Sequence, residues 1–140
     1  MLITPALLAS LNVTRSQFAA RVNTLVARMA TDDSLVLLAC IRLYAFQTQD
    51  EKRIDATVHD NGVGFQYMDA KFGGRMARLL NNGEVVFAHN MPRLRRMARK
   101  YRNQLAYLSF RKEQRAREDK ALAAITPAVE VAPQTLRSAA

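Results

Sequence analysis

This sequence lacks several features that exported, membrane-spanning and disulfide-bonded proteins share. It has one cysteine, Cys40, so no disulfide can form within the chain, and a reducing compartment is expected. The longest apolar stretch, residues 35–41, ends at Arg42 and is far shorter than the roughly 20 residues that cross a bilayer. Residues 1–8 contain no basic residue of the kind with which a signal peptide begins. We therefore expect a soluble, cytoplasmic protein in which Cys40 is a small core residue.

Recognisable catalytic and metal-binding patterns are also lacking. The two histidines, His59 and His89, and Cys40 lie in three separate segments, and their spacing matches no zinc site. No serine stands in a nucleophile elbow, and the glycines of residues 62–64 are not followed by the glycine and lysine of a phosphate-binding loop. The carboxylates between Asp50 and Asp69 have no regular spacing. We therefore expect that the protein is not an enzyme and that it has no catalytic residue, no metal site and no cofactor.

Acidic residues are scarce relative to basic ones. The chain has 21 Lys and Arg against 12 Asp and Glu, which gives a net charge of +9 over 140 residues. An excess of this size favours polyanionic partners, because binding releases the counterions condensed on them. Nucleic acid is the expected partner, ahead of an anionic membrane.

Apolar periodicity predicts an all-α protein, a small bundle of about four helices with a long basic C-terminal helix. Thr14 and Gln17 form a capping box before the first helix, and Asn90 is the expected cap of the last, with Pro92 in its first turn. The predicted helices cover residues 14–30, 35–46, 69–81 and 91–125.

The segments between and after these helices are predicted to be irregular. Residues 47–64 form a polar connector, residues 84–88 a short extended piece, and glycine at position 83 ends the third helix in left-handed geometry. The helix of residues 35–46 is apolar nearly all round, which predicts a central, buried position. We expect one domain over residues 1–124 and a disordered tail over 125–140.

The positive charge is concentrated in the last helix. Residues 91–120 contain eleven basic and three acidic residues, and so account for +8 of the net charge. A seam of Leu94, Ala98, Tyr101, Leu105 and Leu108 is predicted to face the body of the protein. The candidate phosphate-binding residues are Arg93, Arg95, Arg96, Arg99, Lys100, Arg102, Arg111, Lys112 and Arg115. The alternative is a solvated face, or one that pairs with the acidic connector of residues 50–60.

Aromatic residues supply candidate stacking surfaces for unpaired bases. Phe65 and Tyr67, beside a glycine-rich turn, are the candidates for stacking, whereas Phe72 and Tyr101 are expected in the core. Asp69 is expected to cap or begin the third helix. The adjacent Gly73 and Gly74 predict a close approach of the backbone to a neighbouring helix or a ligand.

Two stretches of sequence together carry a resemblance. They are VGFQYMDAKFG at residues 63–73 and ARKYRNQL at residues 98–105. This pair resembles a short module, VGFxxxDAxFG followed by ARxxxKYxxQL, of phage and mobile-element DNA-processing proteins, including helicase-associated ones. The resemblance covers residues 60–108, and the chain departs from the module at Asn90-Met91-Pro92, where an L-T/S-x-K-Q stretch is usual. It implies a DNA or RNA context without supplying a reaction.

Two functions follow as hypotheses. The first is a non-enzymatic accessory protein of phage or mobile-element type that binds the backbone of single-stranded DNA or RNA with low sequence specificity through its basic helix. The second is a protein-binding small subunit, or an inhibitor, of a larger nucleoprotein complex of the CRISPR or replication kind. Salt dependence separates them, because backbone binding weakens steeply with salt.

Overall fold

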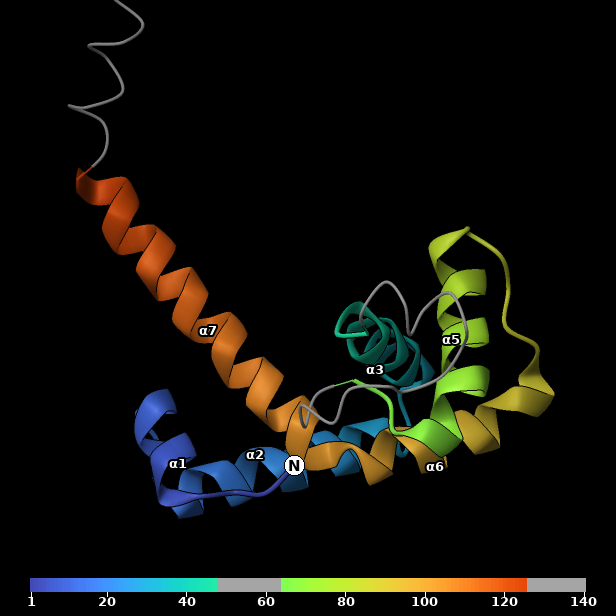
Figure 1. Cartoon of the computed structure of the whole chain (residues 1–140), viewed down its shortest axis with the longest axis horizontal. Helices are drawn as coiled ribbons and strands as arrows, with labels where there is room; N and C mark the ends of the chain where they lie inside the picture. Colours follow the sequence, from blue (N-terminus) through green and yellow to red (C-terminus); the bar gives the residue numbers. More distant parts are fainter. Residues whose placement is uncertain (48–63, 126–140) are drawn as a thin grey trace, which may run out of the picture. The chain divides into compact units, whose positions relative to one another are not determined.

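The computed structural model describes residues 1–47 and 64–125. The predicted connector, apart from its two ends at Gln47 and Gly64, and all but the first residue of the predicted tail lie outside these described residues. The chain divides into two compact units, Met1–Tyr107 and Leu108–Ala140. Every regular element in the described ranges is a helix, so the protein is all-α as predicted, with six α-helices instead of about four (Figure 1).

The first two helices are defined by their caps. Helix α1 (Pro5–Leu11) was not predicted; Thr4 caps it and Asn12 ends it at φ 55°. Helix α2 (Arg15–Met29) begins with the predicted capping box. The Gln17 backbone N–H donates to Thr14 Oγ1 at 3.0 Å, and the Thr14 N–H donates to Gln17 Oε1 at 2.8 Å. Each side chain thus satisfies a backbone group that the first helical turn leaves unpaired.

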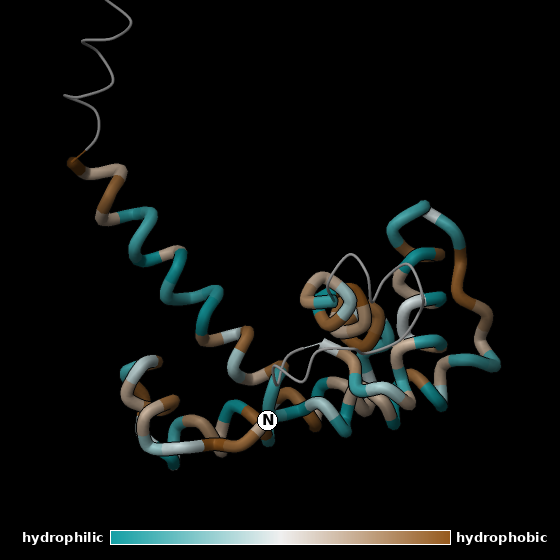
Figure 2. Tube along the Cα trace, in the orientation of Figure 1, coloured by the Kyte–Doolittle hydropathy of each residue, from teal (hydrophilic) through white to brown (hydrophobic). Residues whose placement is uncertain are grey.

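Helix α3 (Asp33–Ala45) lies at the centre of the first unit. Asp32 caps it by accepting from the Leu35 N–H at 3.2 Å. The helix packs against α2, α5 and α6, and its apolar composition stands out as the brown segment among them (Figure 2). The predicted central position is confirmed, although Leu38 is exposed.

Helix α5 (Tyr67–Asn81) begins two residues earlier than predicted, with Gln66 at the N-cap position. It ends as predicted at Gly83, which has φ 75°. The Gly83 N–H donates to the Leu80 oxygen at 3.1 Å and the Glu84 N–H to the Leu79 oxygen at 2.8 Å. This pair of bonds is a Schellman motif, which needs a left-handed residue and therefore favours glycine.

The segment predicted as one long C-terminal helix forms two helices, so the prediction of a continuous helix is wrong. Helix α6 (Met91–Lys100) and helix α7 (Arg102–Ile125) are separated at Tyr101, where the backbone has φ −93° and ψ 18°. The short 3₁₀ helix η1 (Ala88–Asn90) precedes α6. Asn90 occupies the predicted N-cap position of α6, but its side chain makes no cap bond. Residues 84–87 form no strand within the part of the chain described.

The core of the first unit joins helices α2, α3, α5 and α6. The predicted seam is buried at Leu94, Ala98, Tyr101 and Leu105. Phe72 and Cys40 are also in the core, as predicted. The Cys40 thiol donates to the Gly73 carbonyl oxygen at 3.4 Å, which joins α3 to α5.

Burial raises the pKa of the Cys40 thiol from its usual 9.0 to about 12. Because the unfolded thiol ionises near pH 9 while the folded thiol stays protonated, the contribution of this thiol to folding stability is fully present below pH 9. It is lost as the pH rises toward 12. We expect the free energy of unfolding to fall by up to about 1.4 kcal/mol per pH unit between about pH 10 and pH 11. Urea unfolding across this range measures the slope. The same slope in Cys40→Ala would contradict the assignment.

Candidate nucleic-acid interface

Within the described residues, the two stretches that carry the resemblance, 64–73 and 98–105, fold against each other. The Phe65 ring is 1% exposed, and it covers Gly73 so closely that a Cβ on that glycine would lie 2.5 Å from Phe65 Cζ. The Tyr101 ring meets it edge-on, with the ring centroids 6.0 Å apart. Glycine at position 73 therefore serves the approach of a side chain within the protein, and neither a neighbouring helix nor a ligand is needed to explain it.

Two buried glutamine side chains hold the backbone at the start of this corner. Gln47 Nε2 donates to the Phe65 carbonyl oxygen at 3.2 Å. Gln104, with its amide turned to satisfy both partners, donates to the Gly64 carbonyl oxygen at 3.3 Å and accepts from the Gly64 N–H. Gly64 has φ 83°, a left-handed conformation that favours glycine.

Tyr101 and Asp69 join α5 to the end of α6. The Tyr101 hydroxyl accepts from the Gln66 N–H at 2.7 Å and donates to Asp69 Oδ2 at 2.6 Å. Lys100 Nζ binds the same carboxylate oxygen at 2.8 Å. Burial, and then the hydrogen bond to Asp69, raise the pKa of Tyr101 well above its usual value, so the phenol remains a donor at alkaline pH values where a free tyrosine ionises.

This network corrects the predicted role of Asp69. Its carboxylate lies in the first turn of α5, but the N-cap position belongs to Gln66, which makes no side-chain cap bond. Asp69 instead binds Tyr101 and Lys100. The negative charge in the first turn still suits the helix dipole.

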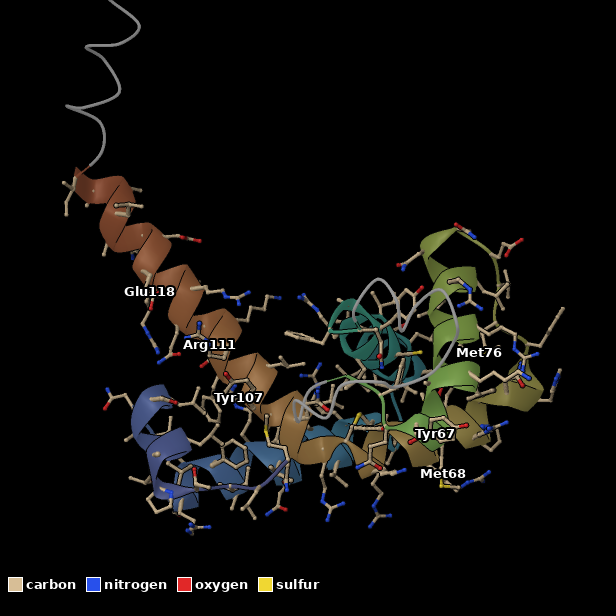
Figure 3. The ribbon with its side chains drawn as sticks, in the orientation of Figure 1. Tyr67, Met68, Met76, Tyr107, Arg111 and Glu118 are labelled. Atoms are coloured by element: carbon tan, nitrogen blue, oxygen red, sulfur yellow. The ribbon has the colours of Figure 1, made fainter. Side chains whose placement is uncertain are left out.

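The two predicted stacking residues differ in their exposure to solvent. Phe65 is buried in the corner, so its ring is not available to a base, and that prediction is wrong. Tyr67, the first residue of α5, is 73% exposed. Figure 3 shows Tyr67 and Met68 at the end of α5 that lies near α6. Stacking on Tyr67 stays a prediction.

Helix α6 is strongly amphipathic. Its buried side consists of Met91, Leu94, Met97 and Ala98, which recur at three- and four-residue steps. The opposite side is exposed and carries only basic side chains after Pro92. These are Arg93, Arg96, Arg99 and Lys100, and exposed Arg102 follows at the start of α7.

Three of the predicted phosphate-binding residues on α6 contact other side chains of the protein. Arg95 is half-buried and binds Asp33 Oδ1 through Nε at 3.1 Å and Nη2 at 2.7 Å. The Arg93 guanidinium lies 3.9 Å from the centroid of the Phe72 ring. Lys100 binds Asp69. These contacts fix the edges of the α6 face, and they leave less of the charge of Arg95 and Lys100 for an external anion.

Arg96 and Arg99 occupy the middle of the exposed α6 face. No side chain within residues 1–47 and 64–125 forms a hydrogen bond or ion pair with the guanidinium of either residue. Arg102 Nη1 donates to the Arg99 carbonyl oxygen at 3.2 Å. The sequence contains no carboxylate from residue 85 to residue 112. Two exposed arginines therefore lack a compensating charge on their own helix.

The remaining predicted residues belong to the second unit and form a group of their own. Arg111 and Arg115 are one turn apart on α7, and Lys112 is next to them. Arg111 Nη1 donates to Gln114 Oε1 at 2.8 Å, while Lys112 and Arg115 are exposed. All three face solvent at least in part.

Three exposed residues of α5 were not among the predicted site residues, namely Met68, Lys71 and Arg75. Lys71 and Arg75 follow Tyr67 at four-residue steps, which places Tyr67, Lys71 and Arg75 on one helix face. This spacing was a readable signal. It was overlooked because the charge count pointed to residues 91–120.

Comparison of the chain with family models, with curated proteins and with solved structures gives no match. Among the described helices, none combines the length and apolar character that crossing a membrane requires.

Proposed function

We propose that this chain is a non-enzymatic nucleic-acid-binding protein that contacts the phosphate backbone of single-stranded DNA or RNA through the exposed face of α6. The observation that carries the proposal is the position of Arg96 and Arg99, exposed and without a carboxylate partner among the described residues. The resemblance of residues 60–108 to a module of phage and mobile-element proteins supports a DNA or RNA context.

The chemistry of the face suits phosphate. An arginine guanidinium presents a planar fork of donors that matches phosphate oxygens, and it keeps its charge at any physiological pH. The buried side of α6 holds the helix against the core, so the cations are positioned before a ligand binds and less entropy is lost on binding. Phosphate contacts carry no sequence information, so we expect low sequence specificity.

Fluorescence anisotropy of labelled oligonucleotides over a salt series tests the proposal. Three exposed cations without a carboxylate partner among the described residues, those of Arg96, Arg99 and Arg102, predict that log K against log salt falls with a slope of about 2 on single strands. A control titration with an uncharged backbone analogue of the same oligonucleotide is expected to show no such slope. Absence of binding at low salt would overturn the proposal.

Exposed apolar residues near the end of α7 favour a second candidate function. Leu122 and Ile125, which are 63% and 71% exposed, lie one turn apart on the last turns of that helix. Such a pair of apolar side chains can pack against the surface of a partner protein, as expected for a small subunit of a nucleoprotein complex. A chain that binds no isolated oligonucleotide at low salt but co-sediments with such a complex would favour this function.

A further inference from the structure

The exposed face of α5 combines apolar and basic side chains. Tyr67 and Met68 are 73% and 82% exposed, and both lie in the first turn, as Figure 3 shows. Exposed Lys71 and Arg75 follow on the same face at four-residue steps. An exposed aromatic ring flanked by cations is the arrangement with which proteins stack unpaired bases.

The charge on this face is uncompensated within the described residues. Neither Lys71 nor Arg75 is paired with any side chain of residues 1–47 or 64–125. Asp69 is the one carboxylate in the sequence of α5, and its Oδ2 is already bound by Lys100 and Tyr101. The face is therefore positive along its length, and its charge complements a polyanion.

Contacts at the edge of α5 connect this face to α6. Met68 lies one turn before Phe72, and Arg93 of α6 covers the Phe72 ring at 3.9 Å. The Lys100–Asp69 pair makes a second link between the same two helices. A strand bound to the exposed arginines of α6 can thus continue onto α5 without meeting an unpaired carboxylate of either helix.

The backbone beneath Tyr67 is rigidly held. The N–H of the preceding residue, Gln66, donates to the Tyr101 hydroxyl at 2.7 Å, and Phe65 is buried against Gly73. Tyr67 consequently projects from a fixed point. Because the backbone is already fixed, only the side-chain torsions of Tyr67 lose freedom when a base stacks on its ring.

We propose that the exposed face of α5 selects single-stranded over double-stranded nucleic acid, with an unpaired base stacked on Tyr67 beside Met68 and the adjoining phosphates bound by Lys71 and Arg75. This inference rests on the proposed function and deepens it. A duplex hides the faces of its bases, so it gains nothing from Tyr67.

The absence of tryptophan from the chain allows a direct test. In Tyr67→Trp the new indole is the only tryptophan, and a base stacked on it quenches its fluorescence. The matched control is Val85→Trp, which places the indole at a position 78% exposed beyond the other end of the 15-residue helix α5, roughly 20 Å along its axis. We expect a short deoxythymidine oligonucleotide to quench the first indole by more than half, and the second by little.

Affinity gives an independent readout. Tyr67→Ser is expected to weaken single-strand binding about tenfold and to leave duplex binding unchanged, while Tyr67→Phe keeps both. If anisotropy shows binding but the Tyr67→Trp indole is not quenched and Tyr67→Ser binds normally, the inference is wrong and the proposed function stands. If no oligonucleotide binds at low salt, both are wrong.

Discussion

Replacing Gly73 by alanine is expected to lower the free energy of unfolding by about 2 kcal/mol or more, although alanine ordinarily favours a helix interior over glycine by about 1 kcal/mol. The reason is steric. The new Cβ would lie 2.5 to 2.7 Å from three atoms of the Phe65 ring. That ring is fully buried and has the edge of Tyr101 against it, so it has little room to move.

A double-mutant cycle separates this overlap from a general loss of packing. Leucine at position 65 lacks the Cζ and Cε atoms that collide, so Gly73→Ala should cost at least about 1 kcal/mol less in a Phe65→Leu background. Urea unfolding followed by circular dichroism measures all four proteins. Additive effects of the two substitutions would show that the close approach of Phe65 and Gly73 is not the cause.

The same corner determines where the candidate ligand-binding groups lie. Phe65 and Gly73 fix the start of α5, and the Tyr101 hydroxyl fixes the Gln66 backbone just before Tyr67. The residues that make the resembled module recognisable in the sequence are thus mostly buried or paired with one another. The exposed residues between and beside them are the ones free to meet a ligand.

Local signals in the sequence predicted much of the fold. The Thr14–Gln17 capping box and Gly83 at the end of α5 both depend on bonds within a few residues, which a sequence displays directly. The three- and four-residue spacing of Leu94, Ala98 and Tyr101 likewise predicted their burial. These predictions are confirmed because propensity and tertiary packing agree at those positions.

Tertiary contacts account for most of what the sequence did not predict. The break at Tyr101 has no glycine or proline to announce it, and the structure places there a buried hydroxyl bonded to Gln66 and Asp69. Helix α1 was missed for a different reason, because Thr4 and Pro5 are local start signals that were read only as the beginning of the chain.

Charge pairing was equally hidden. Arg95 and Asp33 are 62 residues apart in the sequence and 2.7 Å apart in space. Lys100 and Asp69 are 31 residues apart and form an ion pair of 2.8 Å. A count of charges along the last helix treats all its cations alike, whereas the structure distinguishes the paired cations at its edges from Arg96 and Arg99 in the middle.

That distinction leads to the largest functional effect we expect. Reversing the two unpaired charges, in Arg96→Glu/Arg99→Glu, removes the two proposed phosphate contacts and introduces two repulsive charges at the same place. Single-strand binding at low salt should weaken about 100-fold or more, with a shallower salt slope. Both side chains are exposed, so the free energy of unfolding should change by no more than about 0.5 kcal/mol per substitution.

The matched control for this reversal is Arg15→Glu/Arg28→Glu, which changes the net charge equally at two exposed positions of α2. If binding depends on the α6 face, the control should lose less than about tenfold in affinity, through the weaker long-range attraction alone. Anisotropy titrations of the wild type and both variants at one low salt concentration decide the matter. Equal losses in the two variants would show that the ligand responds to net charge, and that Arg96 and Arg99 do not form a site.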